Sequence, residues 1–429
     1  MNRLFNKIRR NRLAANTALM LCGQSVRLAV QALYFIIIAR SLGPRGYGAF
    51  IGVLAFVGIF APYCGLGSGN LLVRDVSRDP GNFAVCWGRA LMVSLLGGGI
   101  LLALVLGLAR LFLPPSIPLL LMFTVGAAEL CFTRLSELSA QCFQAFQIMG
   151  RTAFLWLLPN LLRLAAVLGF IWRSSSPAPL EWSLWYLGAA ALGAACSCVL
   201  VCRELGLPSF AVAHLKTGKR EGLWFSVSLS SQRIYNDIDK TMLSRLATLE
   251  ATGIYSAAYR IIDVAFTPVA SLFHAAYARF FQYGGSGIRQ TAGFARRLFP
   301  VTAGYSIAVG ILLLASASLV QHVLGRGYGD AAEVICWLAP LPFLKSLHYL
   351  AADTLTGSGF QGLRSGIQVV VAVFNVGLNL MLIPAYSWRG AVWSSLASDG
   401  LLAFSLAATA IYLSTREAAT AVAEAGVGA

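Results

Sequence analysis

Long runs of apolar residues alternate along the chain with short segments rich in Gly, Pro and charged residues. A helix needs about 20 predominantly apolar residues to cross a bilayer, and the runs of this order of length predict about twelve transmembrane helices. The expected spans are 13–39, 47–66, 86–111, 118–138, 152–172, 180–202, 223–246, 253–273, 299–320, 334–350, 366–383 and 390–413. The pattern therefore predicts an all-α polytopic membrane protein.

The spacing of a short motif indicates that the chain has two related halves. Arg40 precedes Gly48 by eight residues in ARSLGPRGYGAF, and Arg245 precedes Gly253 by eight residues in SRLATLEATGIY. Such a repeat predicts two bundles that are related by an axis along the membrane normal and face each other across a cavity. We expect an N-terminal six-helix bundle at 1–205, a cytoplasmic linker at 206–222, a C-terminal six-helix bundle at 223–415 and a short cytoplasmic tail at 416–429.

The composition agrees with a membrane protein and adds one prediction, the orientation of the chain in the membrane. The chain has 429 residues, of which 58% are hydrophobic and 12% charged, and its mean hydropathy of +0.72 excludes an ordinary soluble domain. The net charge is +16, but the basic residues lie in short segments between apolar runs. This distribution favours membrane lipids rather than nucleic acid as the partner of these charges. Most of them lie on the same side as the basic N-terminus, so both termini are expected in the cytoplasm.

The sequence shows no pattern typical of an enzyme or a metal site. It has no P-loop, no G-x-S-x-G and no H-E-x-x-H motif. Its nine cysteines are scattered, almost all within apolar runs, and the closest three, Cys196, Cys198 and Cys202, have no His or carboxylate beside them. We therefore predict small apolar packing for these cysteines, and neither catalysis nor a cofactor nor a metal for the chain.

One stretch, residues 226–260, is more polar than its apolar surroundings allow without a reason. Side chains three or four residues apart share one face of a helix, and the polar residues here recur at that spacing. They are Arg233, Asn236, Asp237, Asp239 and Lys240. A charge at bilayer depth costs about 2.5 to 3.5 kcal/mol or more unless it is paired or hydrated. Two interpretations remain open: ion pairs that hold helices together, and a solvated pathway.

Other expected spans also carry polar side chains at helical spacing. Among them are Gln24, Arg27 and Gln31 in the first span, Glu129, Arg134 and Glu137 in the fourth, Asn160 and Arg163 in the fifth, and Tyr259, Arg260 and Asp263 in the eighth. Arg27 and Arg163 have no obvious partner in their own helices, so their guanidinium groups are candidates for binding a phosphate. Arg134 is expected to pair with Glu137, and Arg260 either pairs with Asp263 or stays available. Lys345, His348 and Asp353 are expected to reach the membrane interface.

Four sequence blocks carry a resemblance to a known family. They are ARSLGPRGYGAF after a polar first span, GLGSGN at the end of the second span, and NDIDKTMLSRL and EATGIYSAAYRIID in the second half. The chain resembles the polysaccharide and oligosaccharide flippases of the multidrug/oligosaccharidyl-lipid/polysaccharide exporter superfamily. The resemblance implies two six-helix bundles that form a V around a central cationic cavity. It also implies movement of an undecaprenyl-pyrophosphate-linked oligosaccharide from the cytoplasmic to the periplasmic leaflet of the bacterial inner membrane.

The resemblance also suggests roles for individual residues. In related lipid flippases, arginines in the first and eighth spans engage the pyrophosphate, and Arg27 and Arg260 lie in the comparable spans here. The expected substrate-binding residues are Gln24, Arg27, Gln31, Asn160, Arg163, Arg233, Asn236, Tyr259 and Arg260, and the coupling-ion candidates are Asp237, Asp239 and Asp263. A polysaccharide polymerase and assembly proteins are expected partners.

Two alternative functions remain open from the sequence. One is a cation-coupled multidrug antiporter of the same superfamily, which predicts an acidic, aromatic-lined cavity. The other is a membrane assembly partner that transports nothing, which predicts that all the cavity charges pair with one another. The sequence leaves open whether the glycan belongs to an O-antigen, a capsule or an exopolysaccharide.

Overall fold

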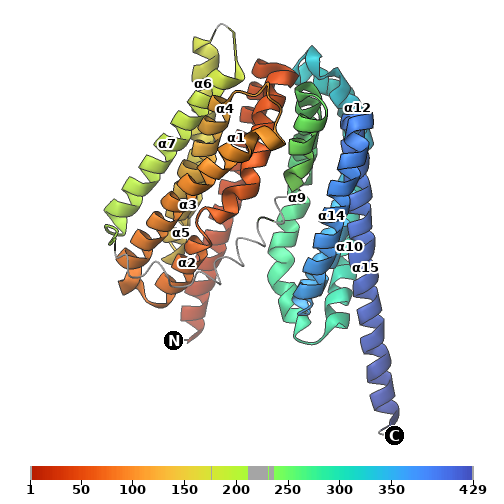
Figure 1. Cartoon of the computed structure of the whole chain (residues 1–429). Helices are drawn as coiled ribbons and strands as arrows, with labels where there is room; N and C mark the ends of the chain where they lie inside the picture. Colours follow the sequence, from red (N-terminus) through yellow and green to blue (C-terminus); the bar gives the residue numbers. More distant parts are fainter. Residues whose placement is uncertain (1, 175, 211–229, 231–235, 428–429) are drawn as a thin grey trace. The chain divides into compact units, whose positions relative to one another are not determined.

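A computed structural model describes residues 2–174, 176–210, 230 and 236–427, and the side chains of all of these except 2–25, 278 and 418–427. In this part of the chain the secondary structure is helical throughout, without a strand (Figure 1). The helices of the first half are α1 (Asn2–Phe60), η1 (Ala61–Tyr63), α2 (Ser68–Arg78), η2 (Pro80–Asn82), α3 (Phe83–Phe112), α4 (Leu119–Ala127), η3 (Ala128–Thr133), α5 (Arg134–Ala145), α6 (Met149–Arg173) and α7 (Pro179–Glu204). Residues 236–246 are also helical.

The second half continues with longer helices and three short ones. These are α9 (Leu249–Gly284), α10 (Ile288–Ser316), η5 (Ala317–Leu319), α11 (Val320–Leu324), η6 (Arg326–Tyr328), α12 (Gly329–Leu338), α13 (Leu341–Gly357), α14 (Gln361–Tyr386) and α15 (Trp388–Val427). The all-α prediction is confirmed.

The chain forms two compact units, Met1–Arg245 and Leu246–Ala429. Residues 236–245 belong to the first compact unit, and the expected bounds of the two bundles stay a prediction. Contacts with α1 explain the assignment: Ser230 Oγ donates to the Ile59 carbonyl at 2.7 Å, and a Cβ on Gly52 would lie 2.9 Å from the Ser244 Cβ. Most of the expected linker, residues 211–222, lies outside the described residues.

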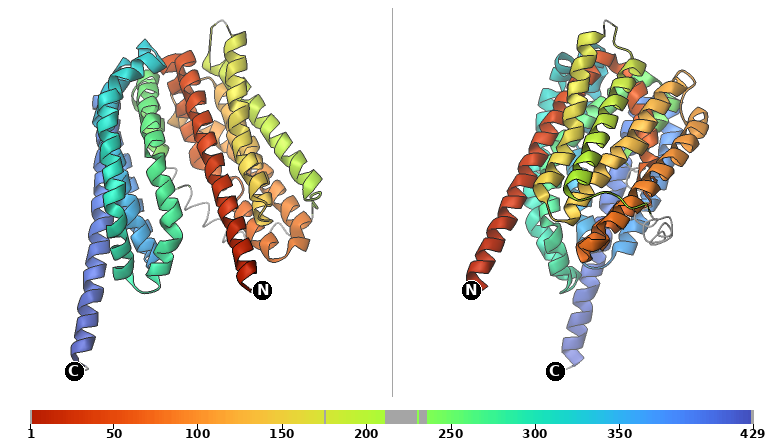
Figure 2. Two further views of the ribbon diagram at one scale, coloured as in Figure 1. Left: turned by 180° about the vertical axis from the view of Figure 1, so that it is seen from behind. Right: turned by 90° about the vertical axis from the view of Figure 1, so that its left-hand side faces the viewer.

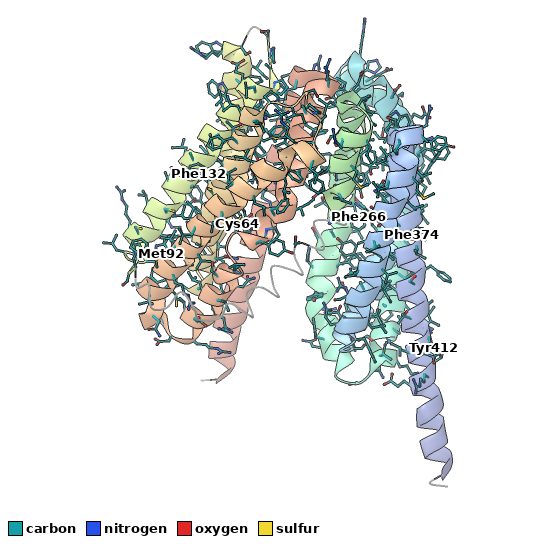
Figure 3. The ribbon with its side chains drawn as sticks, in the orientation of Figure 1. Cys64, Met92, Phe132, Phe266, Phe374 and Tyr412 are labelled. Carbon is teal, nitrogen blue, oxygen red and sulfur yellow. The ribbon has the colours of Figure 1, made fainter. Side chains whose placement is uncertain are left out.

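Within the described residues, eight helices are long and apolar enough to cross a membrane, or nine if one bent pair is counted as a single span. The chain is therefore a multi-pass membrane protein, and the number twelve stays a prediction. The outer faces agree with this, since large apolar side chains such as Phe374 and Tyr412 are exposed to the surroundings (Figure 3). The helix α9 is not among the eight, although its 36 residues are long enough.

Breaks in two helices show where apolar runs end. In α1 the backbone at Gly43 has a φ of 65°, followed by Pro44, which separates the first two expected spans. A left-handed φ favours glycine, and proline lacks the donor that a continuing helix needs. The expected span 334–350 was wrong as a single helix, because α12 and α13 meet at an angle of 46° beside Pro340.

Each unit has a dense set of helix contacts. In the first unit α1 packs along α6, and α6 along α7; both views of Figure 2 show the red ribbon of α1 beside the yellow ribbon of α6. In the second unit α13 packs against α9, α10 and α15, while α14 packs along α15. The central place of α13 matters for the site, because a polar side chain buried on its inner faces is costly unless it finds a partner.

Candidate functional site

A charged cluster lies inside the first unit, and we call Arg163, Glu129, Thr133 and Tyr186 the Arg163 cluster. Arg163 Nη2 donates to Glu129 Oε1 at 2.8 Å and to Thr133 Oγ1 at 3.1 Å. The hydroxyl of Tyr186 donates to the same Glu129 oxygen at 2.6 Å, and the guanidinium carbon lies 4.6 Å from the centre of the Tyr186 ring. The side chains of Arg163 and Glu129 are only 19% and 18% exposed. Such a group of contacts stabilises a cation at membrane depth.

The acidic member of the Arg163 cluster lies on an irregular helix turn. Residues Ala128–Thr133 form a π-helix between α4 and α5, and both Glu129 and Thr133 belong to it. A π-helical turn is rare, interrupts the regular α-helical hydrogen bonds and is often found at functional sites. Thr133 Oγ1 also donates to Glu129 Oε1 at 3.2 Å, which holds the carboxylate toward α6.

Asn160, a second residue predicted for the site, lies one turn before Arg163 on α6 and contacts α1, which contains the first expected span. Gln31 Nε2 donates to Asn160 Oδ1 at 3.0 Å, joining α1 to α6, and Asn160 Nδ2 donates to the Trp156 carbonyl at 3.0 Å. The structure thus brings together Gln31, Asn160 and Arg163. Arg27 lies one turn before Gln31 on α1 and is half-buried, whereas the Gln24 side chain lies outside the described part of the chain.

The polar stretch 236–240 forms ion pairs along its own helix. Lys240 Nζ lies 2.8 Å from Asp237 Oδ1 and 3.7 Å from Asp239 Oδ1, and it donates to the Asn236 carbonyl at 2.8 Å. Asp239 and Lys240 are both buried. The contacts agree with the ion-pair interpretation of this stretch. Arg233, the other cation predicted here, lies outside the described residues.

A second charged cluster lies inside the second unit, and we call Lys345, Asp263 and Tyr259 the Lys345 cluster. Lys345 Nζ of α13 donates to Asp263 Oδ1 of α9 at 2.8 Å and lies 4.6 Å from the centre of the Tyr259 ring. The structure therefore pairs Asp263 with a cation from another helix. Arg260 lies half-buried three residues earlier on α9.

The interface position predicted for Lys345, His348 and Asp353 was wrong. All three side chains are buried, with residue exposures of 8%, 7% and 5%. His348 Nε2 lies 3.2 Å from Asp399 Oδ1 on α15, and Asp353 Oδ1 lies 4.0 Å from Arg364 Nη1 on α14. The reason is the packing of α13 among its neighbours, which places these side chains against other helices and not at the end of a span.

Comparison with known proteins identifies the family. A sequence profile of the family described as "Polysaccharide biosynthesis protein" matches residues 13–283, well over half of the chain. The chain belongs to this family. A sequence search of curated proteins finds no match.

Solved structures of transporters of one superfamily share the fold. An inward-facing multidrug resistance MATE family transporter of the MOP superfamily matches with a TM-score of 0.75 and 13% identity, covering 92% of this chain and 98% of that one. The lipid II flippase MurJ, in an inward closed conformation, matches with a TM-score of 0.73 and 9% identity, covering 91% of this chain and 86% of that one. A MOP superfamily transporter from Pyrococcus furiosus matches with a TM-score of 0.66 and 14% identity, covering 93% of this chain and 95% of that one. These likenesses confirm the all-α fold of a transporter of this kind, while the arrangement of twelve helices as a V of two bundles stays a prediction.

The two clusters have the same chemical parts, although they lie in different units. Each has one cation, one carboxylate from a neighbouring helix, and one tyrosine ring 4.6 Å from the cation. The sequence analysis singled out Arg163, Tyr259 and Asp263 but missed Glu129 and Lys345 as their partners. A charged residue within an apolar run was the available signal for both.

Proposed function

We propose that the chain is a flippase of the bacterial inner membrane for an undecaprenyl-pyrophosphate-linked oligosaccharide. It would move this lipid from the cytoplasmic to the periplasmic leaflet by alternating access, for the synthesis of a surface or secreted polysaccharide. Membership of the polysaccharide biosynthesis family supports a role in such a pathway, and the fold shared with MurJ, a lipid II flippase, supports a lipid-linked substrate.

The observation that carries the proposal is which nitrogens of the Arg163 guanidinium group have hydrogen-bond partners. Its Nη2 serves Glu129 and Thr133, but its buried Nε has no hydrogen-bond partner among the described residues. An unpaired buried donor costs about 1 to 3 kcal/mol. A phosphate oxygen would satisfy it, and guanidinium groups bind phosphates through two parallel hydrogen bonds.

The substrate chemistry explains why a chain in this family would hold cations and amides at membrane depth. A pyrophosphate and hydrated sugars cannot cross hydrocarbon unaided, because unpaired charges and hydroxyls each cost several kcal/mol there. We assign the phosphates to Arg27, Arg163 and Arg260. The sugar hydroxyls would pair with Gln24, Gln31, Asn160, Asn236 and Tyr259, with Arg233 as a further cation. Asp237, Asp239 and Asp263 are the proposed coupling-ion ligands.

A second candidate is a cation-coupled multidrug antiporter. It is favoured by the fold shared with the MATE family transporter. The fold does not decide between the two, since the Pyrococcus furiosus transporter of the same superfamily is described as having a binding pocket of reverse polarity that suggests a different function. The two candidates differ in the charge of the substrate, which makes them separable by a binding experiment.

The test measures binding of the lipid-linked oligosaccharide to the purified full-length protein in detergent, with a lipophilic cationic drug as the competing candidate. We expect the glycolipid to bind, and Arg163→Lys to weaken its binding about tenfold, since lysine keeps the charge but loses the guanidinium fork. Arg389→Lys, an exposed arginine paired with Glu333, is the matched control and should bind like the wild type. Binding of the drug alone, with no binding of the glycolipid, would refute the proposal.

A further inference from the structure

The regular helical path is interrupted between α1 and α2, and we call residues 64–67 the α2 break. The last two residues of the break have left-handed backbone angles, with a φ of 43° at Leu66 and 68° at Gly67. Such an angle at leucine costs free energy, and strain of this kind is concentrated at functional sites. A new helix, α2, begins directly after the break at Ser68 and runs for 11 residues. The break therefore places the N-terminus of a helix inside the first unit.

The α2 break lies at membrane depth, beside the middle of α3. A Cβ on Gly97 of α3 would lie 2.1 Å from the Cys64 carbonyl oxygen, and Gly97 belongs to the uncharged run 90–109. Figure 3 shows Cys64 about midway along the first unit. In hydrocarbon, irregular backbone is tolerated only where protein buries it or where it lines a water-filled cavity. The polar groups of the break therefore need partners other than lipid tails.

Several donors at the N-terminus of α2 have no acceptor among the described residues. The Ser68 amide donates to the Gly65 carbonyl at 2.8 Å, but the amides of Gly69 and Asn70 donate to no backbone carbonyl in this part of the structure. No described side chain caps the helix either. Gly69 and Asn70 are half-buried, so a ligand can approach their backbone.

A buried hydroxyl at the same helix end also lacks a partner. Ser68 is 5% exposed, and its Oγ has no hydrogen-bond partner among the described residues. This oxygen and the Ser94 Oγ of α3 each lie 3.2 Å from the position that a Cβ on Gly65 would take. The Ser68 hydroxyl is thus directed at the turn that precedes α2. Buried hydroxyls are normally hydrogen-bonded, so an unpaired one at a helix N-terminus points to a missing acceptor.

An ion pair of α5 adds to the electrostatic surroundings of the α2 break. Arg134 is paired with Glu137. Both charges act on the Cys64 thiol in the break, and the guanidinium group acts more strongly than the carboxylate. The pair therefore favours an anion at this place, in the same direction as the partial positive charge of a helix N-terminus.

We propose that the N-terminus of α2 binds a phosphate group of a membrane lipid, with the amides of Gly69 and Asn70 and the Ser68 hydroxyl as donors. Free amides at a helix N-terminus suit phosphate oxygens, and half-helices that begin at membrane depth direct their N-termini at anionic substrate groups. The phosphate belongs either to a polyprenyl pyrophosphate or to a phospholipid headgroup. The first source rests on the proposed function, whereas the site itself does not.

The first test observes the site directly in the purified full-length protein. Four glycines of the chain follow a serine, namely Gly69, Gly287, Gly359 and Gly366. Cell-free synthesis with ¹³C-carbonyl serine and ¹⁵N-glycine therefore gives four amide signals for this pair of labels, and Ser68→Ala removes and so identifies the signal of Gly69. We expect farnesyl pyrophosphate or phosphatidylglycerol to shift this signal and not the other three, and farnesol, which has no phosphate, to shift none. A Gly69 signal that neither phosphate ligand moves would overturn the site.

The second test measures the contribution of the hydroxyl by calorimetric titration with whichever phosphate ligand moves the Gly69 signal. We expect Ser68→Ala to weaken binding about tenfold, since a hydrogen bond to a charged group is lost. Ser77→Ala, at the exposed end of the same helix, is the matched control and should bind like the wild type. Because the buried Ser68 hydroxyl has no partner, Ser68→Ala should unfold at the same temperature or higher, which separates lost binding from misfolding. Unchanged binding by Ser68→Ala would overturn the proposal.

The choice of ligand separates the site from the proposed function. Binding of farnesyl pyrophosphate in preference to phosphatidylglycerol would support the site and assign it to the polyprenyl substrate. Ser68-dependent binding of phosphatidylglycerol alone would support the site and assign it to the phospholipid headgroup. If the lipid-linked oligosaccharide does not bind, the proposed function fails, while the Gly69 signal still decides whether the N-terminus of α2 holds a phosphate.

Discussion

At the scale of single residues, Arg163 and Glu129 depend on each other. Replacing Glu129 with Gln keeps the size of the side chain but leaves a guanidinium group without its counter-ion in a largely buried place. We expect Glu129→Gln to lower the free energy of unfolding by about 2 to 3 kcal/mol, somewhat less than the loss at a fully buried pair. Denaturant unfolding in detergent, followed by tryptophan fluorescence, measures the difference.

The matched control is Glu333→Gln, which breaks an arginine–glutamate ion pair at the surface. Glu333 and Arg389 are paired at 3.1 Å, but their side chains are 44% and 52% exposed. Exposed ion pairs contribute little to stability. We therefore expect no measurable change in unfolding, and an equal effect of the two substitutions would contradict the importance assigned to the buried pair.

The separation of two paired residues along the sequence explains which ion pairs of the site could be predicted. Arg134 with Glu137, and Asp237 with Lys240, are three residues apart on one helix, and helical spacing alone predicted that each pair shares a face. Arg163 and Glu129 are 34 residues apart, and Lys345 and Asp263 are 82 apart. Their pairing depends on which helices pack together and in which rotation, and no local pattern encodes that.

At the scale of helices, two glycines set the distance between α9 and α13. A Cβ on Gly284 would overlap the Gly357 carbonyl oxygen, and one on Gly357 would lie 2.5 Å from the Phe280 carbonyl oxygen. We expect Gly284→Ala to push the two helices apart and to lower stability by about 1 to 3 kcal/mol. Because Asp263 and Lys345 belong to these helices, their contact should loosen as well. Thermal unfolding of the purified variant measures the loss.

A glycine on α10 provides a control, because its replacement by alanine should change stability in the opposite direction. Gly304 lies within the helix, and an added Cβ meets no atom within 4 Å. Alanine there should raise stability by up to about 1 kcal/mol, because glycine loses more conformational freedom in a helix. If Gly284→Ala were as stable as Gly304→Ala, the close approach of α9 and α13 would not be a constraint on the fold.

Helix positions followed from the sequence wherever an apolar run was uniform. The expected spans 86–111, 152–172 and 180–202 each lie within one helix, α3, α6 and α7 respectively. The pattern was less informative where proline intervenes, because Pro340 lies between α12 and α13 within the expected span 334–350.

At the scale of the whole molecule, the distribution of basic residues predicts the orientation in the membrane. Loops rich in Lys and Arg stay in the cytoplasm, so both termini should lie there. Green fluorescent protein fused to the C-terminus should fluoresce, and alkaline phosphatase fused at the same place should be inactive. The reverse result would show that the positive-inside rule has been applied to the wrong set of loops, and it would reverse the proposed direction of transport.

The fold of the whole chain leaves the substrate undecided, because the solved structures that share it include both a multidrug transporter and a lipid flippase. The central claim is that this chain moves a lipid-linked oligosaccharide between leaflets. Its most direct test is leaflet-resolved flipping of an undecaprenyl-pyrophosphate-linked oligosaccharide in proteoliposomes, with the wild type compared with Arg27→Ala, Arg260→Ala and the double variant at matched folded amounts. The account predicts flipping by the wild type that falls at least about tenfold in the double variant, since each charge-assisted contact contributes about 1.5 to 3 kcal/mol. Absence of flipping by the wild type, together with efflux of a cationic drug, would contradict the account.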